Sequence, residues 1–376
     1  MEKFDYIIVG AGCSGLSLAY EMNVKNLFND KTCAIIDKRK EFNRDKIWSY
    51  WNIYEHSFYD CLINKWDKFC VKKNHDEKVL DCDDFQYQSI DSQKFYKKIL
   101  NNLNLNKNIK LILNKSVDKI YENKDEAVVQ CGDEIFRSDI IFNSSLDNRT
   151  TKENELFQHF YGCEVVFDEN INLQEYPIIM DFNCSQDNWV HFFYTLPMGK
   201  NQIFIENTWI SNTKNFTLER YIAEINYYIK NNLNYKKKYK TNYSEIGSIP
   251  MFHFKNNVQY KKIINIGTAG NLTRKSTGYT FLNIQKTVKQ IAINISNKQN
   301  IKEASVSLKY NCLDNIFIKV LLEKKGSMYE VFFNLFKKNK TKDIVKFLSN
   351  TSNWFEDLKI ILSMPKLIFI KKLLNL

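Results

Sequence analysis

The sequence predicts an α/β protein in which a parallel sheet with helices is interrupted by an antiparallel sheet and followed by a helical C-terminal region. Three observations lead to this fold class. A glycine-rich turn follows a short apolar run near the N-terminus, a second glycine-rich turn occurs about 250 residues later, and alternating apolar and polar residues lie between them. Distant glycine turns of this kind indicate one nucleotide held by two ends of a fold.

The first 40 residues have the pattern of a β-α-β unit. The apolar run at 6–9 predicts a buried strand, and residues 16–22 predict a helix. Between them lies a G-x-G-x-x-G motif. Gly10 permits a tight turn, Gly12 lets the backbone approach a pyrophosphate, and Gly15 allows close packing of helix on strand. This context predicts a Rossmann-like dinucleotide-binding unit.

A second strand at 33–36 ends in Asp37, 22 residues beyond Gly15. This spacing is close to the ~20 residues expected for a carboxylate that hydrogen-bonds the adenosine ribose. We therefore expect Asp37 to bind the ribose of the nucleotide.

The second glycine turn follows an apolar run at 263–266 and contains Gly267, Thr268 and Gly270. A nicotinamide dehydrogenase does not usually need this second turn, so FAD is preferred to NAD as the cofactor. We expect the second turn to approach the flavin side of FAD.

The middle of the chain has a different pattern. Residues 189–194 and 202–206 alternate between apolar and polar side chains, which predicts antiparallel strands. The predicted organisation is a FAD-binding β-α-β unit with a flavin-proximal segment (1–85), a continuation of that domain (86–150), an antiparallel substrate-binding sheet (151–255), a return to the FAD domain (256–300), and a helical, basic C-terminal region (301–376).

Composition narrows the class of protein. The 376 residues are 44% hydrophobic and 14% aromatic, which excludes a disordered chain, and no apolar run approaches the ~18 residues of a membrane span. The nine cysteines include no C-x-x-C pair and the five histidines lack metal-ligand spacing, so we expect reduced thiols and no metal. Charged residues at the start leave no room for a signal peptide, which predicts a cytoplasmic protein.

The C-terminal region is basic and apolar. Residues 315–376 contain twelve lysines and five acidic residues, a balance of seven positive charges, beside the apolar clusters 331–336 and 367–370. This composition suits the anionic inner face of a membrane. An ordinary solvated helical face is the alternative, and nucleic acid is not expected because no binding motif is present.

Several short segments, in this order, resemble the lycopene cyclase family over nearly the whole chain. They are 43–51, 158–162, 180–182, 193–197, 204–208, 245–251 and 276–281. The resemblance implies redox-neutral cyclisation of the acyclic ends of lycopene to β-ionone rings, giving β-carotene via γ-carotene. It also implies reduced FAD as the cofactor, with NAD(P)H as one source of its electrons. Because a C40 hydrocarbon must be collected from lipid, the basic, apolar C-terminal region then predicts a peripheral place on the membrane.

The same resemblance assigns roles to single residues. Glu206 matches the essential acid of the family, with Phe204 and Trp209 expected to exclude water around it. Asp181 is the second catalytic candidate, either tuning Glu206 or serving as a structural cap.

Arg44 and Trp48 match a segment that would line the flavin or the polyene channel, as would the nearby Trp51, with plain core packing as the alternative.

Two other classes share these features. An FAD-dependent monooxygenase or an isoprenoid reductase would have both nucleotide turns but would consume NAD(P)H or oxygen stoichiometrically. A carotenoid-binding protein would keep the pocket without turnover. The sequence leaves open β or ε rings, one ring or two, and lycopene or another acyclic carotenoid.

Overall fold

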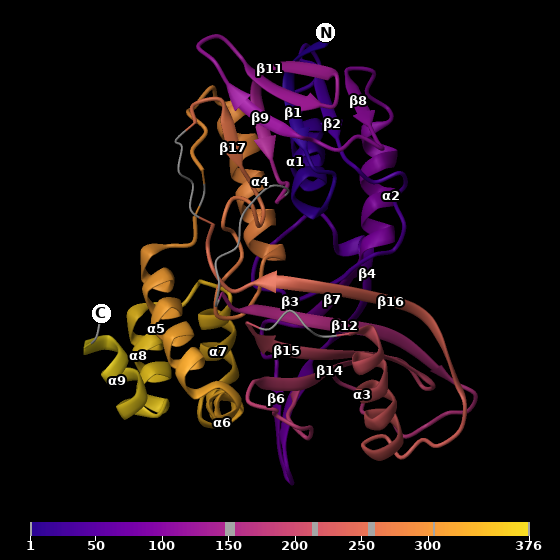
Figure 1. The fold of residues 1–376 in the computed structure, drawn as a ribbon, viewed down its shortest axis with the longest axis vertical. Coiled ribbons are helices and arrows are strands. Elements are labelled where there is room, and N and C mark those ends of the chain that lie inside the picture. The colour runs from indigo at the N-terminus through magenta and orange to yellow at the C-terminus, as the bar shows by residue number, and fades with distance from the viewer. Residues whose placement is uncertain (1, 147–154, 213–216, 255–259, 304, 375–376) are drawn as a thin grey trace.

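A computed structural model describes residues 2–146, 155–212, 217–254, 260–303 and 305–374. Two large sheets lie at opposite ends of the molecule, and the C-terminal helices lie beside the second sheet (Figure 1). The mixed α/β architecture confirms the predicted fold class, including the inserted antiparallel sheet and the helical C-terminal region. The divisions predicted at 150 and 255 lie outside the described residues.

The first sheet carries the predicted β-α-β unit. Its strands are β1 (Glu2–Val9), β2 (Cys33–Ile36), β8 (Ile109–Ile112), β9 (Lys119–Glu122), β10 (Ala127–Cys131), β11 (Glu134–Asn143) and β17 (Ile263–Asn265). Strands β8, β2, β1 and β11 are parallel neighbours in that order, β17 adds to β11 in parallel, and β10 and β9 continue the sheet antiparallel. The chain thus returns to its first sheet after the inserted segment.

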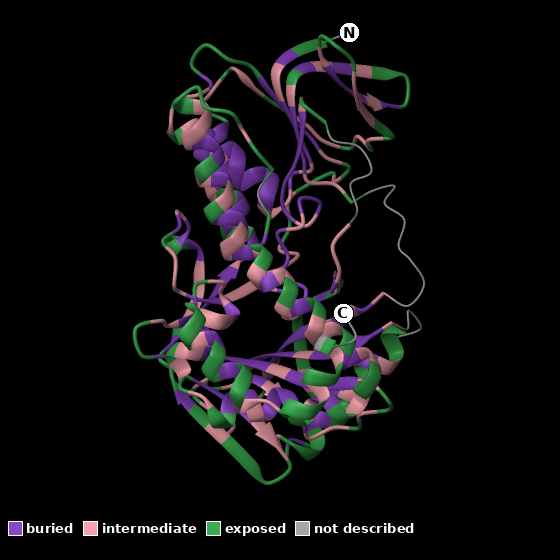
Figure 2. Ribbon diagram, turned by 90° about the vertical axis from the view of Figure 1, so that its left-hand side faces the viewer, coloured by how far each residue is buried: buried purple, intermediate pink, exposed green. Residues whose placement is uncertain are grey.

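Three helices belong to this end of the molecule. They are α1 (Cys13–Val24), α2 (Ser92–Leu103) and α4 (Phe281–Ser296). Helix α1 packs against both of the others, because its middle is apolar on nearly every side and every residue from Ser14 to Ala19 is buried. The inner strands of the sheet are buried as well (Figure 2).

The second sheet has the strand order β16-β12-β15-β14-β13-β5-β6. The bounds are β5 (Lys68–Lys73), β6 (Asp76–Asp81), β12 (Phe157–Phe167), β13 (Ile178–Asp181), β14 (Val190–Gly199), β15 (Gln202–Ser211) and β16 (Tyr239–Pro250). All neighbours are antiparallel except β13 and β5. The division predicted at residue 85 assigned β5 and β6 to the FAD domain. The structure places them in the second sheet, because β5 pairs with the distant β13.

Helices cover both faces of this sheet. Helix α3 (Leu218–Asn231) packs on one face with Phe193 and Ile205, and α6 (Tyr329–Lys338) packs on the other with Phe192 and Phe204. The remaining C-terminal elements are α5 (Leu308–Lys324), η2 (Lys325–Met328), α7 (Thr341–Leu348), α8 (Trp354–Ser363) and α9 (Lys366–Leu374). The apolar cluster 331–336 therefore belongs to the core, and its predicted membrane role is wrong because α6 buries it against the sheet.

A small sheet connects the two ends. It consists of β3 (Ile47–Trp51), β7 (Tyr87–Asp91) and β4 (Leu62–Trp66), with the short helix η1 (Tyr59–Cys61) before β4. Trp48 packs against the hydrophobic core formed by the first sheet and its helices. Trp51 belongs to the hydrophobic core formed by the second sheet and the C-terminal helices. Within the described ranges, no helix is both long and apolar enough to cross a bilayer.

Candidate active site

The first glycine turn joins β1 to α1 and leaves space in front of the helix. Gly10 has a φ of +93°, and a Cβ on Gly15 would lie 1.9 Å from the Gly10 carbonyl oxygen, so both positions require glycine. A Cβ on Gly12, in contrast, would lie 4.0 Å from its nearest neighbour, Arg39 Nη2. Gly12 caps α1 and lines a cavity. The free amides of the first helical turn therefore face space that fits a pyrophosphate.

Asp37 lies directly after β2 and beside this turn. Its carboxylate accepts hydrogen bonds from the backbone N–H groups of Ala11 (2.5 Å) and Arg39 (2.7 Å). An ionised carboxylate has about four acceptor positions, so capacity remains for ribose hydroxyls. Arg39 also forms an ion pair with Asp37 at 3.3 Å and lines the cavity near Gly12. Arg39 brings a positive charge to the turn and is not among the residues predicted for this site.

The second glycine turn packs directly on the first. Gly267 has a φ of +62°, and a Cβ there would lie 2.8 Å from Ser14 Cβ. A Cβ on Gly270 would lie 2.5 Å from the Asn265 carbonyl oxygen, and Thr268 lines the cavity. The Ser14 hydroxyl is buried without a hydrogen-bond partner in the described parts of the chain. The structure thus brings the two turns together and leaves a polar group between them unpaired.

Arg44 does not reach this cavity. Its guanidinium forms ion pairs of 2.9 Å with both Asp91 and Glu164 and lies over the ring of Tyr243 at 4.1 Å. These three partners hold the Arg44 side chain between β7, β12 and β16. The structure therefore places Arg44 with two carboxylates and apart from the residues that line the cavity, and its binding of the cofactor stays a prediction.

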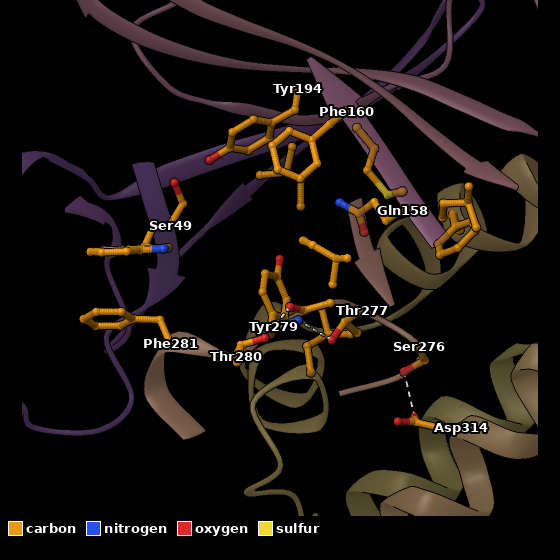
Figure 3. A pocket seen from close by; sticks show the side chains of 18 of the residues that line it. Ser49, Gln158, Phe160, Tyr194, Ser276, Thr277, Tyr279, Thr280, Phe281 and Asp314 are labelled. Atoms are coloured by element: carbon orange, nitrogen blue, oxygen red, sulfur yellow. Dashed lines mark hydrogen bonds between the residues drawn. The ribbon is translucent and has the colours of Figure 1, made fainter. Parts of the chain in front are cut away.

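A cavity of about 860 Å³ runs from the glycine turns to the second sheet and the C-terminal helices. Aromatic side chains from all of these parts form its walls, as Figure 3 shows for the central section. They include Trp48, Phe160, Tyr194, Tyr279, Phe332 and Phe369. Trp48 therefore lines the cavity, whereas Trp51 packs behind it against Tyr279 at 5.6 Å. The walls suit a large hydrocarbon ligand.

Glu206 faces this cavity from the middle of the second sheet. The strand register places Tyr194, Glu206, Gly162 and Glu245 in one row across β14, β15, β12 and β16. The Glu206 carboxylate accepts a hydrogen bond from the Thr208 hydroxyl at 2.7 Å. Burial, with the nearby charge of Glu245, raises the pKa of Glu206 to about 8. Burial therefore favours the protonated form of Glu206, which makes its proton available for transfer.

Gly162 lies between Glu206 and Glu245 in this row and has no side chain to fill the space between them. A Cβ on Gly162 would lie 2.4 Å from the Phe204 ring, so that ring fills the space beside Glu206. Phe204 is on the cavity face of β15, as expected for a residue that excludes water. Trp209 is on the other face, where its indole N–H donates to Glu224 of α3 at 3.1 Å. The expectation that Trp209 shields Glu206 is therefore wrong.

Glu245 is a second carboxylate in the cavity wall. It accepts hydrogen bonds from the Ile47 backbone N–H at 2.9 Å and from the Tyr243 hydroxyl. Burial raises the pKa of Glu245, while Lys46 and these two donors oppose the increase. In the sequence, Glu245 is only the first residue of the motif 245–251 and is not among the predicted catalytic residues. The signal that marks it is its pairing through β12 with Glu206, which requires knowledge of the register.

Asp181 lies on the opposite face of the sheet from Glu206. It pairs with Phe193 on β14, and its carboxylate accepts hydrogen bonds from the Tyr228 hydroxyl of α3 (2.8 Å) and from Asn183 N (3.0 Å). Burial raises the pKa of Asp181, and both hydrogen bonds oppose the increase. The structure does not bring Asp181 to the cavity. Of the two roles expected for it, only the structural one fits this position.

A buried ion pair lies where the loop after the second glycine turn meets the C-terminal helices in the cavity wall. Arg274 contacts Asp314 of α5 at 3.2 Å and donates to the Phe347 carbonyl of α7. Ser276 donates to the same Asp314 oxygen at 2.7 Å, as Figure 3 shows. Arg274 and Asp314 are almost completely buried. This ion pair fastens the C-terminal helices to the loop after the second glycine turn.

Solved structures with similar folds include a reductase-like protein, a monooxygenase and a protein described as a flavoprotein/dehydrogenase. A geranylgeranyl bacteriochlorophyll reductase-like protein from Thermoplasma acidophilum is 13% identical, with a TM-score of 0.65 over 100% of this chain and 99% of that chain. The p-nitrophenol 4-monooxygenase PnpA from Pseudomonas putida DLL-E4 is 12% identical, with a TM-score of 0.61 over 100% and 98%. A flavoprotein/dehydrogenase from Cytophaga hutchinsonii is 11% identical, with a TM-score of 0.61 over 100% of both chains. These similarities show the fold.

Sequence comparison identifies the family. No curated protein sequence matches the chain. The family described as lycopene cyclase protein matches residues 5–373, which include both glycine turns, the strand of Glu206 and the C-terminal helices. The match thus covers nearly all of the chain, and the protein belongs to the lycopene cyclase family.

Proposed function

We propose that the protein is a lycopene β-cyclase that acts with reduced FAD. The observation that carries this proposal is the position of Glu206, which faces the same aromatic cavity as the two glycine turns. Burial raises the pKa of Glu206 to about 8, which favours its protonated form. The substrate would be lycopene or a related acyclic carotenoid, and the cavity walls suit its hydrocarbon chain.

The reaction begins with a proton. Glu206 donates its proton to the terminal alkene of the substrate, and a tertiary carbocation forms. The neighbouring double bond attacks that cation and closes a six-membered ring. Loss of a proton from the ring forms the new alkene, and the carboxylate left on Glu206 is an acceptor for it. One proton is gained and one is lost, so substrate and product have the same mass.

The residues around Glu206 protect the cation. Aromatic faces such as those of Phe160 and Tyr194 stabilise positive charge through their ring quadrupoles, and the largely apolar walls limit attack by water. Reduced FAD, when bound, would supply a further electron-rich ring.

Seven of the predicted residues remain in the proposed cofactor site, and Arg39 is added to them. The seven are Gly10, Gly12, Gly15, Asp37, Gly267, Thr268 and Gly270.

Replacing Glu206 tests the acid. Glu206→Gln keeps the shape of the side chain and removes its transferable proton, so we expect turnover to fall by about 10²–10⁴. The measurement is cyclic product formed anaerobically from lycopene with reduced FAD, resolved by chromatography, in protein shown to retain FAD. Glu175→Gln, at an exposed position, is the matched control. Near-normal turnover by the Glu206→Gln protein would eliminate Glu206 as the donor.

Stoichiometry separates the alternatives. A cyclase needs NAD(P)H, or another donor, only to reduce the flavin once, whereas a monooxygenase or isoprenoid reductase consumes it in every cycle. The monooxygenase and reductase alternatives are retained because solved structures of a reductase-like protein and a monooxygenase have similar folds. A carotenoid-binding protein would show binding with no product. Product mass and NAD(P)H consumption, measured together, distinguish all three, and chromatography distinguishes β from ε rings.

The proposed place of the protein is the cytoplasmic side of a membrane. A C40 hydrocarbon dissolves in lipid rather than water, so the enzyme must collect it from a bilayer. The basic C-terminal region supports a peripheral position, with twelve lysines against five acidic residues in 315–376.

A further inference from the structure

The last two helices expose an unusually large apolar surface. Within α8 and α9, eight large apolar side chains are exposed: Trp354, Phe355, Leu358, Ile361, Leu362, Leu367, Ile370 and Leu374. Trp354, Phe355 and Leu367 are each more than 70% exposed. We call these eight side chains the α8–α9 face. Soluble proteins rarely leave so many large apolar groups together in water without a partner.

This face includes part of the cavity wall. Ile361 and Ile370 line the cavity and are also 42% and 48% exposed. These two residues therefore belong both to the cavity wall and to the exposed α8–α9 face. Phe369 also lines the cavity and stacks on Phe317 of α5 at 6.4 Å, which continues the apolar wall.

The charges around the face are positive. Lys366 and Lys371 are exposed on α9, and the exposed Lys359 of α8 pairs with Asp343 of α7 at 3.7 Å. The two acidic residues of these helices are already paired with lysines from other elements: Glu356 with Lys346 and Asp357 with Lys309, each at 2.6 Å. Among the described residues, Lys366 and Lys371 have no acidic partner, so the net charge beside the apolar side chains is positive. Apolar side chains flanked by lysines fit an anionic lipid surface.

We propose that the α8–α9 face docks on an anionic bilayer and that the substrate passes from the lipid into the cavity between Ile361 and Ile370. This proposal rests on the proposed function for the identity of the substrate. The apolar side chains enter the acyl boundary, and the lysines contact anionic headgroups. The hydrocarbon then moves from lipid to the aromatic walls without crossing water. In Figure 1 the two helices lie at the outer edge of the molecule, away from α3.

A native tryptophan reports docking. Of the six tryptophans, Trp354 alone is exposed, so vesicles of phosphatidylglycerol with brominated acyl chains should quench mainly its fluorescence. We expect quenching in the native protein and a clear loss of the quenchable component in Trp354→Phe. Equal quenching in both proteins, or none in the native protein, would overturn the docking face.

Negative charges introduced on the α8–α9 face test its role in docking, and the same change on another exposed surface is the control. The variant Leu362→Glu/Leu367→Glu changes two exposed side chains outside the cavity wall, and each change should weaken vesicle binding about tenfold or more. The matched control is Ile222→Glu/Tyr227→Glu on α3, where two exposed apolar side chains lie on a different element. Equal loss of binding in the control would refute the assignment.

Two substrate preparations separate entry from catalysis. With lycopene in vesicles, Leu362→Glu/Leu367→Glu should lose turnover in proportion to binding, and with lycopene in detergent micelles it should match the native protein. Equal turnover from vesicles would overturn the proposal. If the native protein forms no cyclic product from either preparation, the proposed function fails, while the fluorescence and binding measurements still decide whether the face docks.

The cavity mouth has its own test. Ile361→Trp and Ile370→Trp add bulk where the wall meets the surface, so each should slow turnover from micelles as well as from vesicles while the FAD content stays normal. Unchanged turnover in both variants would place substrate entry elsewhere.

Discussion

Replacing Gly12 with valine should empty the nucleotide site while the protein stays folded. A Cβ at this position would have 4.0 Å to its nearest neighbour, Arg39 Nη2, and the backbone φ is −85°, which any residue adopts. At a helix N-cap the change from glycine to an apolar residue costs about 1 kcal/mol or less. The valine methyl groups would instead occupy the space in front of the α1 amides. The substitution therefore acts on the ligand rather than on the fold.

The expected loss of affinity follows from the hydrogen bonds that the valine would block. If two amide bonds to the pyrophosphate are lost, each with a charged acceptor and worth about 1.5–3 kcal/mol, binding weakens by about 3–6 kcal/mol. This corresponds to about 10²–10⁴ in the Kd for FAD. The assay is fluorescence titration of the apoprotein with FAD, together with the free energy of unfolding from denaturant titration of the apoprotein.

Two other glycines serve as controls. Gly199→Val lies at the end of β14, where a Cβ would lie 3.9 Å from Gln202 Cβ, so both FAD affinity and stability should stay close to native. Gly15→Ala should instead prevent normal folding, because its Cβ would lie 1.9 Å from the Gly10 carbonyl oxygen. A Gly12→Val protein that binds FAD with native affinity would refute the placement of the pyrophosphate at this turn.

Two further predictions concern buried charges. Glu245→Gln removes a neighbouring negative charge and should therefore lower the pKa of Glu206 from about 8. The alkaline decline in activity should then begin at a lower pH than in the native enzyme. A pH–rate profile measures this shift, and an unchanged profile would contradict the coupling of the two glutamates. Arg274→Ala should lower the free energy of unfolding by about 3–5 kcal/mol, because it leaves Asp314 buried without its ion pair. Denaturant titration measures this loss, and the double variant Arg274→Ala/Asp314→Ala should lose less than the two single variants combined.

The parts of the fold that depend on local sequence were predictable. The glycine motif with its flanking apolar runs predicts the β-α-β unit, because each element is set by residues within about 30 positions. The alternation at 189–194 and 202–206 likewise predicts strands that the structure has as β14 and β15. Pairing between distant strands was not predictable: β5 joins β13 across more than 100 residues, and nothing local indicates that partner.

In the candidate site, too, features set by local sequence were predictable and features set by the pairing of distant strands were not. Glu206 can be located from its motif, but its partner in the cavity wall cannot, because Glu245 is brought level with it only by the pairing of both strands with β12. Asp181 was misleading for a related reason. The register shifts between Ile178 and Asp181, and which face a side chain takes after such an irregularity cannot be determined from alternation alone.

Apolar runs on helices were also ambiguous. The cluster 331–336 and the cluster 367–370 both contain several large apolar residues. The first is buried between α6 and the second sheet, whereas Leu367 and Ile370 in the second are exposed. A sequence pattern measures how apolar a helix is, but the element that covers it is decided by tertiary packing.

The late return of the chain to its first sheet has a consequence for synthesis. β11 ends at Asn143, and β17, which pairs with Ile141–Asn143, begins only at Ile263. Ribosomes add about 5–20 residues per second, so this part of the strand edge stays open for about 6–24 s while the inserted sheet emerges. During that time the nascent protein has an unpaired, apolar strand end and no second glycine turn. Nascent chains arrested before residue 263 should therefore be unable to retain the nucleotide, and those arrested well beyond it should gain that ability in one step.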